Sequence, residues 1–139
     1  MRLINWSLVL AVLVLASLIA FIFSINFVMA RDLGQWTTTD QSIRHWYESL
    51  MQPDNPAVSC CGEADAYFCS ETYENGHVVC VIDDDRDDKK LRREHIDNGT
   101  RIEIPDNKLK YDQGNPTGHA VVFLSSAHYV WCFVRGGGV

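Results

Sequence analysis

Five cysteines carry the most evident chemistry of the 139-residue chain, and none of them lies in its first 59 residues. A thiol can serve as a nucleophile, a metal ligand or half of a disulfide, and its compartment and neighbours decide which. Because five is odd, at least one thiol is left over or pairs with another chain. The five are Cys60, Cys61, Cys69, Cys80 and Cys132.

Cys69 and Cys80 flank a hairpin signal, Glu74-Asn75-Gly76, which predicts a disulfide between them. A four-residue loop would place the two cysteines directly opposite each other, near the separation that a disulfide tolerates. A two-residue loop would instead place them diagonally, on the same face of the hairpin.

Cys132 lies on a late strand that is expected to be buried, and it is expected to pair with Cys60 or Cys61. Either neighbour satisfies the spacing, and we assign the bridge to Cys61. Because it closes a loop of about seventy residues, this bridge would stabilise the fold by roughly 2–4 kcal/mol. The remaining cysteine of the pair is then the thiol that is free to react.

One alternative makes this thiol a nucleophile. The motif Cys60-Cys61-Gly62 and the strand Gly118–Phe123 resemble the catalytic segments of papain-like cell-wall peptidases of the NlpC type. The resemblance implies a thiol hydrolase in which His119 converts Cys60 or Cys61 to a thiolate. It covers two short patches, and the chain departs from the family where a β-hairpin replaces the long helix after the cysteine. A structural disulfide and a core histidine are the competing interpretation.

The acidic run after residue 82 has the spacing of a calcium-binding loop. Asp83, Asp85, Asp87 and Glu94 stand at positions 1, 3, 5 and 12 of such a loop. Asp88, however, replaces the glycine of its sharp turn, and nearby basic residues can neutralise the acids. We therefore expect a solvated, self-paired loop without a metal or cofactor, with calcium binding as the alternative.

A transition-metal site is a further alternative, because imidazole and thiolate are suitable ligands. The sequence contains no CxxC motif and no paired-histidine spacing that would bring such ligands together. The candidate ligands are His77, His95, His119, His128 and the spare thiol.

Residues 1–30 form a hydrophobic segment without a charged side chain after the second residue. Its last residues, Val28-Met29-Ala30, fit the small-residue motif of a signal-peptide cleavage site. The apolar run is also long enough to cross a membrane as an uncleaved anchor helix. Both interpretations place residues 31–139 outside the cytoplasm: in the periplasm, at the outer face of the inner membrane, or secreted after cleavage.

Residues 31–139 contain eleven basic and eighteen acidic side chains, which gives this part of the chain a net charge of −7. An acidic surface argues against nucleic acids and anionic lipid headgroups as partners, since both attract basic patches. The length suits one domain with a modest core.

This exported part is predicted to begin with one helix. Thr38 is its candidate N-cap, with Gln41 as the capping-box partner, and Pro53 ends it. The helix has an apolar face formed by Ile43, Trp46, Tyr47 and Leu50.

Alternating polarity, apolar runs and turn signals predict strands in the rest of the chain. We expect a mainly β domain: one N-terminal helix, then a small antiparallel sheet or barrel stabilised by disulfides. The predicted strands are Tyr67–Thr72, His77–Ile82, Arg101–Ile104, His119–Leu124 and Tyr129–Val134.

The stretch Ser59–Tyr67 and the loop Gly114–His119 resemble segments of a group of small exported bacterial proteins without an assigned function. Further segments, residues 31–36 and 49–54, extend this likeness over nearly all of residues 31–139. The resemblance implies export and a single domain, and it implies no activity.

We interpret the chain as a non-enzymatic, exported domain that binds a protein or envelope ligand. Polar loop residues flanked by glycine and proline often form binding surfaces, so we expect Gly62–Tyr67 and the Asn115–His119 loop to make the contact. An accessory subunit of a membrane complex, anchored by residues 1–30, is a further hypothesis. The expected contact residues are Glu63, Asp65, Tyr67, Asn115 and His119.

Overall fold

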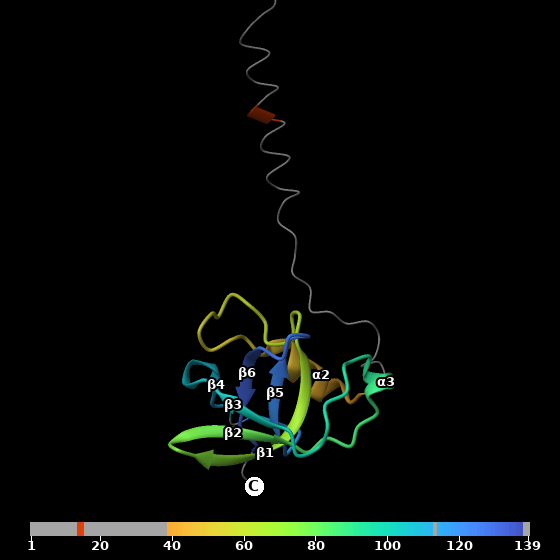
Figure 1. Cartoon of the computed structure of the whole chain (residues 1–139). Coiled ribbons are helices and arrows are strands. Elements are labelled where there is room, and N and C mark those ends of the chain that lie inside the picture. Colours follow the sequence, from red (N-terminus) through yellow and green to blue (C-terminus); the bar gives the residue numbers. More distant parts are fainter. Residues whose placement is uncertain (1–13, 16–38, 113, 138–139) are drawn as a thin grey trace, which may run out of the picture.

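The computed structural model describes residues 14–15, 39–112 and 114–137, and this part of the chain is mainly β (Figure 1). Its leading helix, α2, is followed by strands, as the sequence predicts. A short helix, α3, was not predicted. The elements are α2 (Gln41–Ser49), β1 (Asp65–Glu74), β2 (His77–Ile82), α3 (Asp88–Leu91), β3 (Arg101–Ile104), the 3-10 helix η1 (Asp106–Lys108), β4 (Leu109–Lys110), β5 (Ala120–Leu124) and β6 (Val130–Val134).

The strands form one curved sheet, a half-barrel, in the order β3-β2-β1-β5-β6-β4. Neighbouring strands are antiparallel except for β4, which pairs with β6 in parallel and so corrects the expectation of a purely antiparallel sheet. The reason is the link through η1, which carries the chain from one sheet edge, β3, to the other, β4, without reversing its direction.

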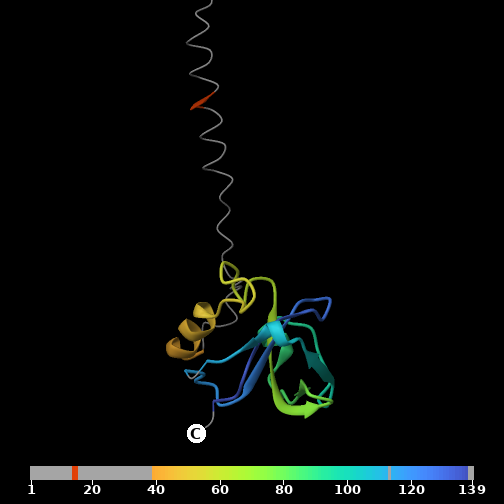
Figure 2. The same ribbon diagram turned by 90° about the vertical axis from the view of Figure 1, so that its left-hand side faces the viewer.

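Both faces of the sheet are buried, and α2 lies on one of them (Figure 2). Apolar residues from β1, β2, β5 and β6 fill the inside of the curve, whereas α2 and the loop after it pack on the other face. β5 contributes to both cores and is buried along its whole length, which explains its continuous apolar sequence. Each core contains one disulfide.

Helix α2 is capped by Asp40 rather than by Thr38, which lies outside the described residues. The Asp40 carboxylate accepts a hydrogen bond from the Ser42 amide at 2.8 Å, so Gln41 is the first helical residue and has no capping-box role. An ionised oxygen at this position both satisfies a free amide and interacts favourably with the helix dipole.

The β1–β2 hairpin turns through two residues, Asn75 and Gly76, between the paired Glu74 and His77. Asn75 and Gly76 have φ values of 51° and 88°, the left-handed conformations that a tight hairpin turn requires and that Asn-Gly adopts most readily. The two-residue loop is thus the correct one of the two expected arrangements.

This register places Cys69 opposite Ile82 and Cys80 opposite Glu71, so the two cysteines are diagonal neighbours on one face. Their Cα atoms lie 5.5 Å apart, and a disulfide joins them inside the curve of the sheet. Strand twist brings such a diagonal pair within bonding reach.

The predicted signal or anchor segment, residues 1–30, lies outside the described residues except for Val14 and Leu15. In the described part of the chain, no helix combines the length and the apolar character that a membrane span needs. The two disulfides favour an oxidising, non-cytoplasmic environment for the domain.

Candidate functional site

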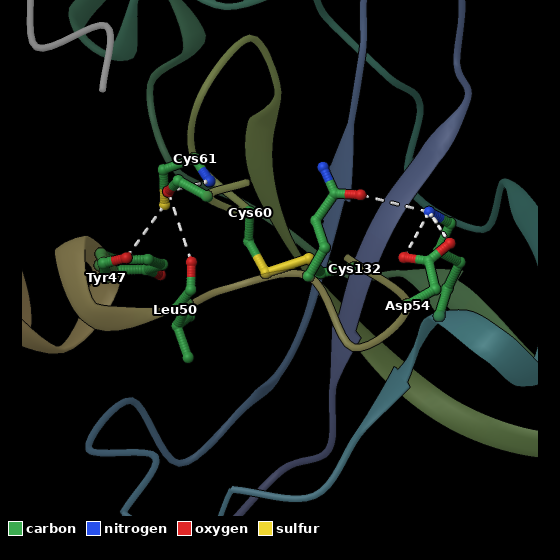
Figure 3. The surroundings of a disulfide bond; sticks show 9 residues. Tyr47, Leu50, Asp54, Cys60, Cys61 and Cys132 are labelled. Atoms are coloured by element: carbon green, nitrogen blue, oxygen red, sulfur yellow. Dashed lines mark hydrogen bonds and ion pairs between the residues drawn. A yellow bond between two sulfur atoms is a disulfide. The ribbon is translucent and has the colours of Figure 1, made fainter. Parts of the chain in front are cut away.

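The loop after α2 folds back on itself and brings Cys60 to the sheet. The Cys60 amide donates to the Leu50 carbonyl at 2.8 Å, and Cys60 is joined to Cys132 on β6, with 5.6 Å between their Cα atoms (Figure 3). The expected bridge from Cys132 to one of the two adjacent cysteines is therefore confirmed, but it uses Cys60 and not Cys61, to which we assigned it. Cys60 and Cys61 lie in a turn, which directs the Cys60 side chain to β6 and the Cys61 thiol to the end of α2.

Cys61 keeps a free thiol that points towards α2 (Figure 3). Its Sγ donates to the Tyr47 carbonyl near the end of the helix, at 3.3 Å. Burial disfavours the thiolate, and the nearby Glu48 carboxylate adds to this effect, so the pKa of Cys61 is raised to about 12. A thiol with this pKa is protonated at neutral pH and makes a poor nucleophile.

A buried lysine holds the same loop from the other side. Lys108 is only 4% exposed, and its Nζ lies 2.7 Å from the Asp54 carboxylate and 3.3 Å from the Gln52 side-chain oxygen. The hydrogen bond from Lys108 lowers the pKa of Asp54. The loop that carries Cys60 and Cys61 is thus fixed at both ends.

His119 does not reach these cysteines. Cys60 is bonded to Cys132, which pairs with Phe123, and His119 lies four residues before Phe123. Four residues of strand cover about 13 Å. The pair required by the hydrolase hypothesis is therefore not assembled in this structure.

The imidazole of His119 stacks instead on Phe68, with ring centroids 4.6 Å apart. The Arg86 guanidinium lies 3.5 Å from the centroid of the same Phe68 ring. Two groups this close cannot share one face of the ring, so Phe68 is held between the histidine and the arginine.

Two of the expected contact residues are buried and act as structural groups. Tyr67 is 3% exposed, and its hydroxyl donates to the Glu94 carbonyl at 2.8 Å. Asn115 is 8% exposed, and its amide donates to the carbonyls of His119 and Arg135. These two side chains are thus unsuited to contact a partner.

The remaining three, Glu63, Asp65 and His119, are partly or fully exposed but lie apart. Asp65 pairs with Leu124 at one end of the β1–β5 ladder, and His119 precedes the other end. The expected contact surface is therefore split between the two ends of the sheet, because β1 and β5 run antiparallel.

The charged segment after β2 contains a buried ion-pair network. Its side chains bind backbone groups of β1 that a neighbouring strand would otherwise bind. The Asp84 carboxylate accepts a hydrogen bond from the Phe68 amide at 2.9 Å. The guanidinium groups of Arg86 and Arg93 both donate to the Ala66 carbonyl. Arg93 also lies 2.7 Å from Asp84 and 2.5 Å from Asp88. These side chains satisfy the polar edge of β1 beyond the point where β2 ends.

The expected self-pairing is confirmed, because Arg86 and Arg93 pair with Asp84 and Asp88, but the expectation of a solvated loop was wrong for the centre of this segment. The side chains of Asp84 and Arg93 are 1% and 2% exposed. Hydrogen bonds from the two arginines and the Phe68 amide outweigh desolvation and hold the pKa of Asp84 far below its usual range. The same network holds Tyr67, whose ring lies 4.4 Å from the Arg93 guanidinium.

The acids proposed as calcium ligands have other roles. The Asp87 carboxylate caps α3 by accepting from the Lys89 and Lys90 amides, whereas Asp83, Asp85 and Glu94 are exposed. Within the described ranges, no group of three or more histidine, cysteine, aspartate or glutamate side chains is arranged to hold a metal ion. None of the four candidate transition-metal histidines, all of which lie in these ranges, belongs to such a group.

Sequence reasoning missed one surface feature, which we call the tyrosine–arginine patch: Tyr73, Tyr111, Arg135 and Glu71. The Arg135 guanidinium lies 5.6 Å from the Tyr73 ring and 4.9 Å from the Tyr111 ring. It donates to the Tyr73 hydroxyl at 2.5 Å and pairs with Glu71 at 3.4 Å. The tyrosines are 60% and 76% exposed.

The patch was missed because its members come from β1, the end of β4 and the end of β6, which only the sheet brings together. A weak signal was present: Tyr111 and Arg135 each follow the last residue of a strand. The Asn115 amide, which binds the Arg135 carbonyl, attaches the 115–119 loop to this end of the sheet.

Neither a scan against protein-family models, nor a search of curated proteins, nor a search of solved structures finds a match to this chain.

Proposed function

We propose that the chain is a non-enzymatic, exported, disulfide-stabilised domain that binds a protein or envelope ligand through the tyrosine–arginine patch. The observation that carries the proposal is the pair of tyrosines, 60% and 76% exposed, held around one arginine. Tyrosine and arginine are enriched among the residues that contribute most to binding energy at protein interfaces. Half of the surface expected from the sequence, the 115–119 loop, adjoins this patch.

Rigidity of the supporting scaffold adds to this argument. Glu71 and Tyr73 lie on β1, whose neighbour β2 is joined to it by the Cys69–Cys80 disulfide. Arg135 directly follows β6, which the second disulfide fixes to the loop after α2. Side chains that are already positioned lose less entropy on binding, so such a surface favours recognition.

The alternative of a thiol hydrolase finds no supporting contact. The Cys61 thiol is directed to α2 and has a raised pKa, and His119 is stacked on Phe68. Catalysis by this pair would require the thiol and the imidazole to approach within hydrogen-bonding distance.

Site-specific photo-crosslinking in the cell envelope tests the proposal. A photoreactive phenylalanine analogue at position 111 is expected to form an adduct that Arg135→Lys weakens. The matched control is the same analogue at position 129, because Tyr129 is also exposed, at 59%, and lies over Lys108. Equal adducts at both positions, or an adduct at 111 that Arg135→Lys leaves unchanged, would contradict the proposal.

A further inference from the structure

We propose that the ligand of the tyrosine–arginine patch is an extended, proline-rich peptide segment of another protein. This inference rests on the proposed function and adds the chemical class of the partner. Proline-rich segments form polyproline II helices, which dock on exposed aromatic rings and lose little conformational entropy on binding.

The upper limit on the separation of the rings is compatible with this ligand. Because both rings lie within 5.6 Å of the Arg135 guanidinium carbon, the centroids of Tyr73 and Tyr111 are at most about 10.5 Å apart. One turn of a polyproline II helix advances about 9 Å, which lies within this upper limit. On this proposal, prolines one turn apart each pack on one tyrosine.

Hydrogen-bonding capacity fits as well. Both polar side-chain contacts of Arg135 within the described residues use Nη2, which leaves the donors of Nη1 for a ligand. A polyproline II backbone has no internal hydrogen bonds, so its carbonyl oxygens are free to accept. Arg135, which contacts the rings of both Tyr73 and Tyr111, thus offers N–H donors to the carbonyl oxygens of a peptide that packs on the two rings.

Charge favours a neutral segment over a strongly charged one. Arg135 is already paired with Glu71 at 3.4 Å, so the centre of the patch carries no net charge, although the chain as a whole has a formal net charge of −6. A strongly acidic peptide would be repelled by the remaining surface, and a strongly basic one would have to displace Arg135 from Glu71.

The test measures binding of two labelled peptides to the full chain by fluorescence anisotropy: a polyproline peptide of about three turns and a control in which alanines replace the prolines. The polyproline peptide is expected to bind, and the control is expected to bind at least about tenfold more weakly. Tyr111→Ala and Arg135→Lys should each weaken binding about tenfold, as interface anchors do.

Tyr129→Ala serves as the control variant, because it removes an equally exposed tyrosine over a cation from another part of the surface. It should leave peptide affinity unchanged. No difference between the two peptides would overturn the inference, and so would equal losses in Tyr111→Ala and Tyr129→Ala.

An amino-sugar oligosaccharide is added as a second probe, to separate this inference from the proposed function. Binding of the oligosaccharide at the patch without binding of polyproline would overturn the peptide ligand, while the patch would remain a binding surface. If the position-111 adducts described above are also absent, both proposals fail together.

Discussion

The clearest consequence at the scale of single residues concerns the reactivity of Cys61. Its Sγ contacts the end of α2, and burial together with Glu48 raises the pKa to about 12. The thiolate is the reactive form, so native protein at pH 8 should react with an alkylating reagent about a thousandfold more slowly than an unperturbed thiol does.

Mass spectrometry of the unreduced protein checks this prediction. One label is expected after denaturation in urea without reductant, and almost none in the native state over the same time. Rapid labelling of native Cys61 would show that the thiol is accessible and ionisable, and would return the hydrolase hypothesis to consideration.

A second prediction concerns the buried network around Asp84. Asp84→Ala would remove one of the two carboxylates that pair with the Arg93 guanidinium, 2% exposed, and would leave the Phe68 amide without its acceptor, so it should lower the free energy of unfolding by about 2–4 kcal/mol. Asp85→Asn is the matched control, because Asp85 is exposed and asparagine retains an acceptor for Asn98. Its effect should stay within about 0.5 kcal/mol. Equal urea midpoints for the two variants would contradict the assigned role of Asp84.

At the scale of elements, the segment from α3 to β3 should make stability depend on pH. His95 lies 2.7 Å from Asp88 and 3.2 Å from Asp97, and these carboxylates raise its pKa above the usual 6.5. A raised folded-state pKa gives stability that is complete below the unfolded-state value and is lost as the pH rises through the folded-state value. The urea midpoint should therefore fall as the pH rises from the unfolded-state value of 6.5 through the raised folded-state pKa of His95.

His95→Gln should flatten this part of the pH profile, whereas His77→Gln, at an exposed position on the hairpin, should leave the slope unchanged.

In acid, stability should change with pH in the opposite direction, because the pKa of Asp88 is lowered by its hydrogen bonds to His95 and Arg93. The stability due to Asp88 is complete above the unfolded-state value of 3.8 and is lost as the pH falls through the folded-state pKa. A midpoint independent of pH in the wild type would contradict this account.

Elements defined by local patterns could be predicted from the sequence. Local sequence is enough to predict a hairpin turn at Asn75-Gly76. It is also enough to predict two strands, from the alternation in Arg101–Ile104 and from the apolar run of β5. The cap of α2 was misplaced by two residues, since Thr38 and Asp40 are both acceptable caps and only the packing of the helix chooses between them.

Features that depend on tertiary contacts could not be predicted. The parallel β4–β6 pair and the tyrosine–arginine patch join segments whose proximity is set by the curvature of the sheet. The choice of Cys60 over Cys61 depends on how the turn that contains both residues is oriented towards β6. The burial of Asp84 depends on the unpaired edge of β1, which local sequence does not reveal.

At the scale of the whole molecule, the two disulfides stabilise different parts of the domain. Cys69–Cys80 lies inside the curve of the sheet and closes a separation of 11 residues. Cys60–Cys132 lies between the sheet and α2 and closes a separation of 72 residues. The bridges lie in separate cores, so their contributions should be close to additive.

The longer bridge should contribute more to stability, because it removes more conformational entropy from the unfolded chain. The chain-entropy relation gives about 4.4 kcal/mol for the bridge between Cys60 and Cys132 and about 2.8 kcal/mol for the bridge between Cys69 and Cys80. Replacing each pair by serines and measuring urea unfolding tests this order. The Cys69→Ser/Cys80→Ser protein should remain folded under conditions in which the Cys60→Ser/Cys132→Ser protein begins to unfold. The reverse order would mean that strand pairing within the hairpin, rather than closure of the long loop onto α2, limits the stability of the domain.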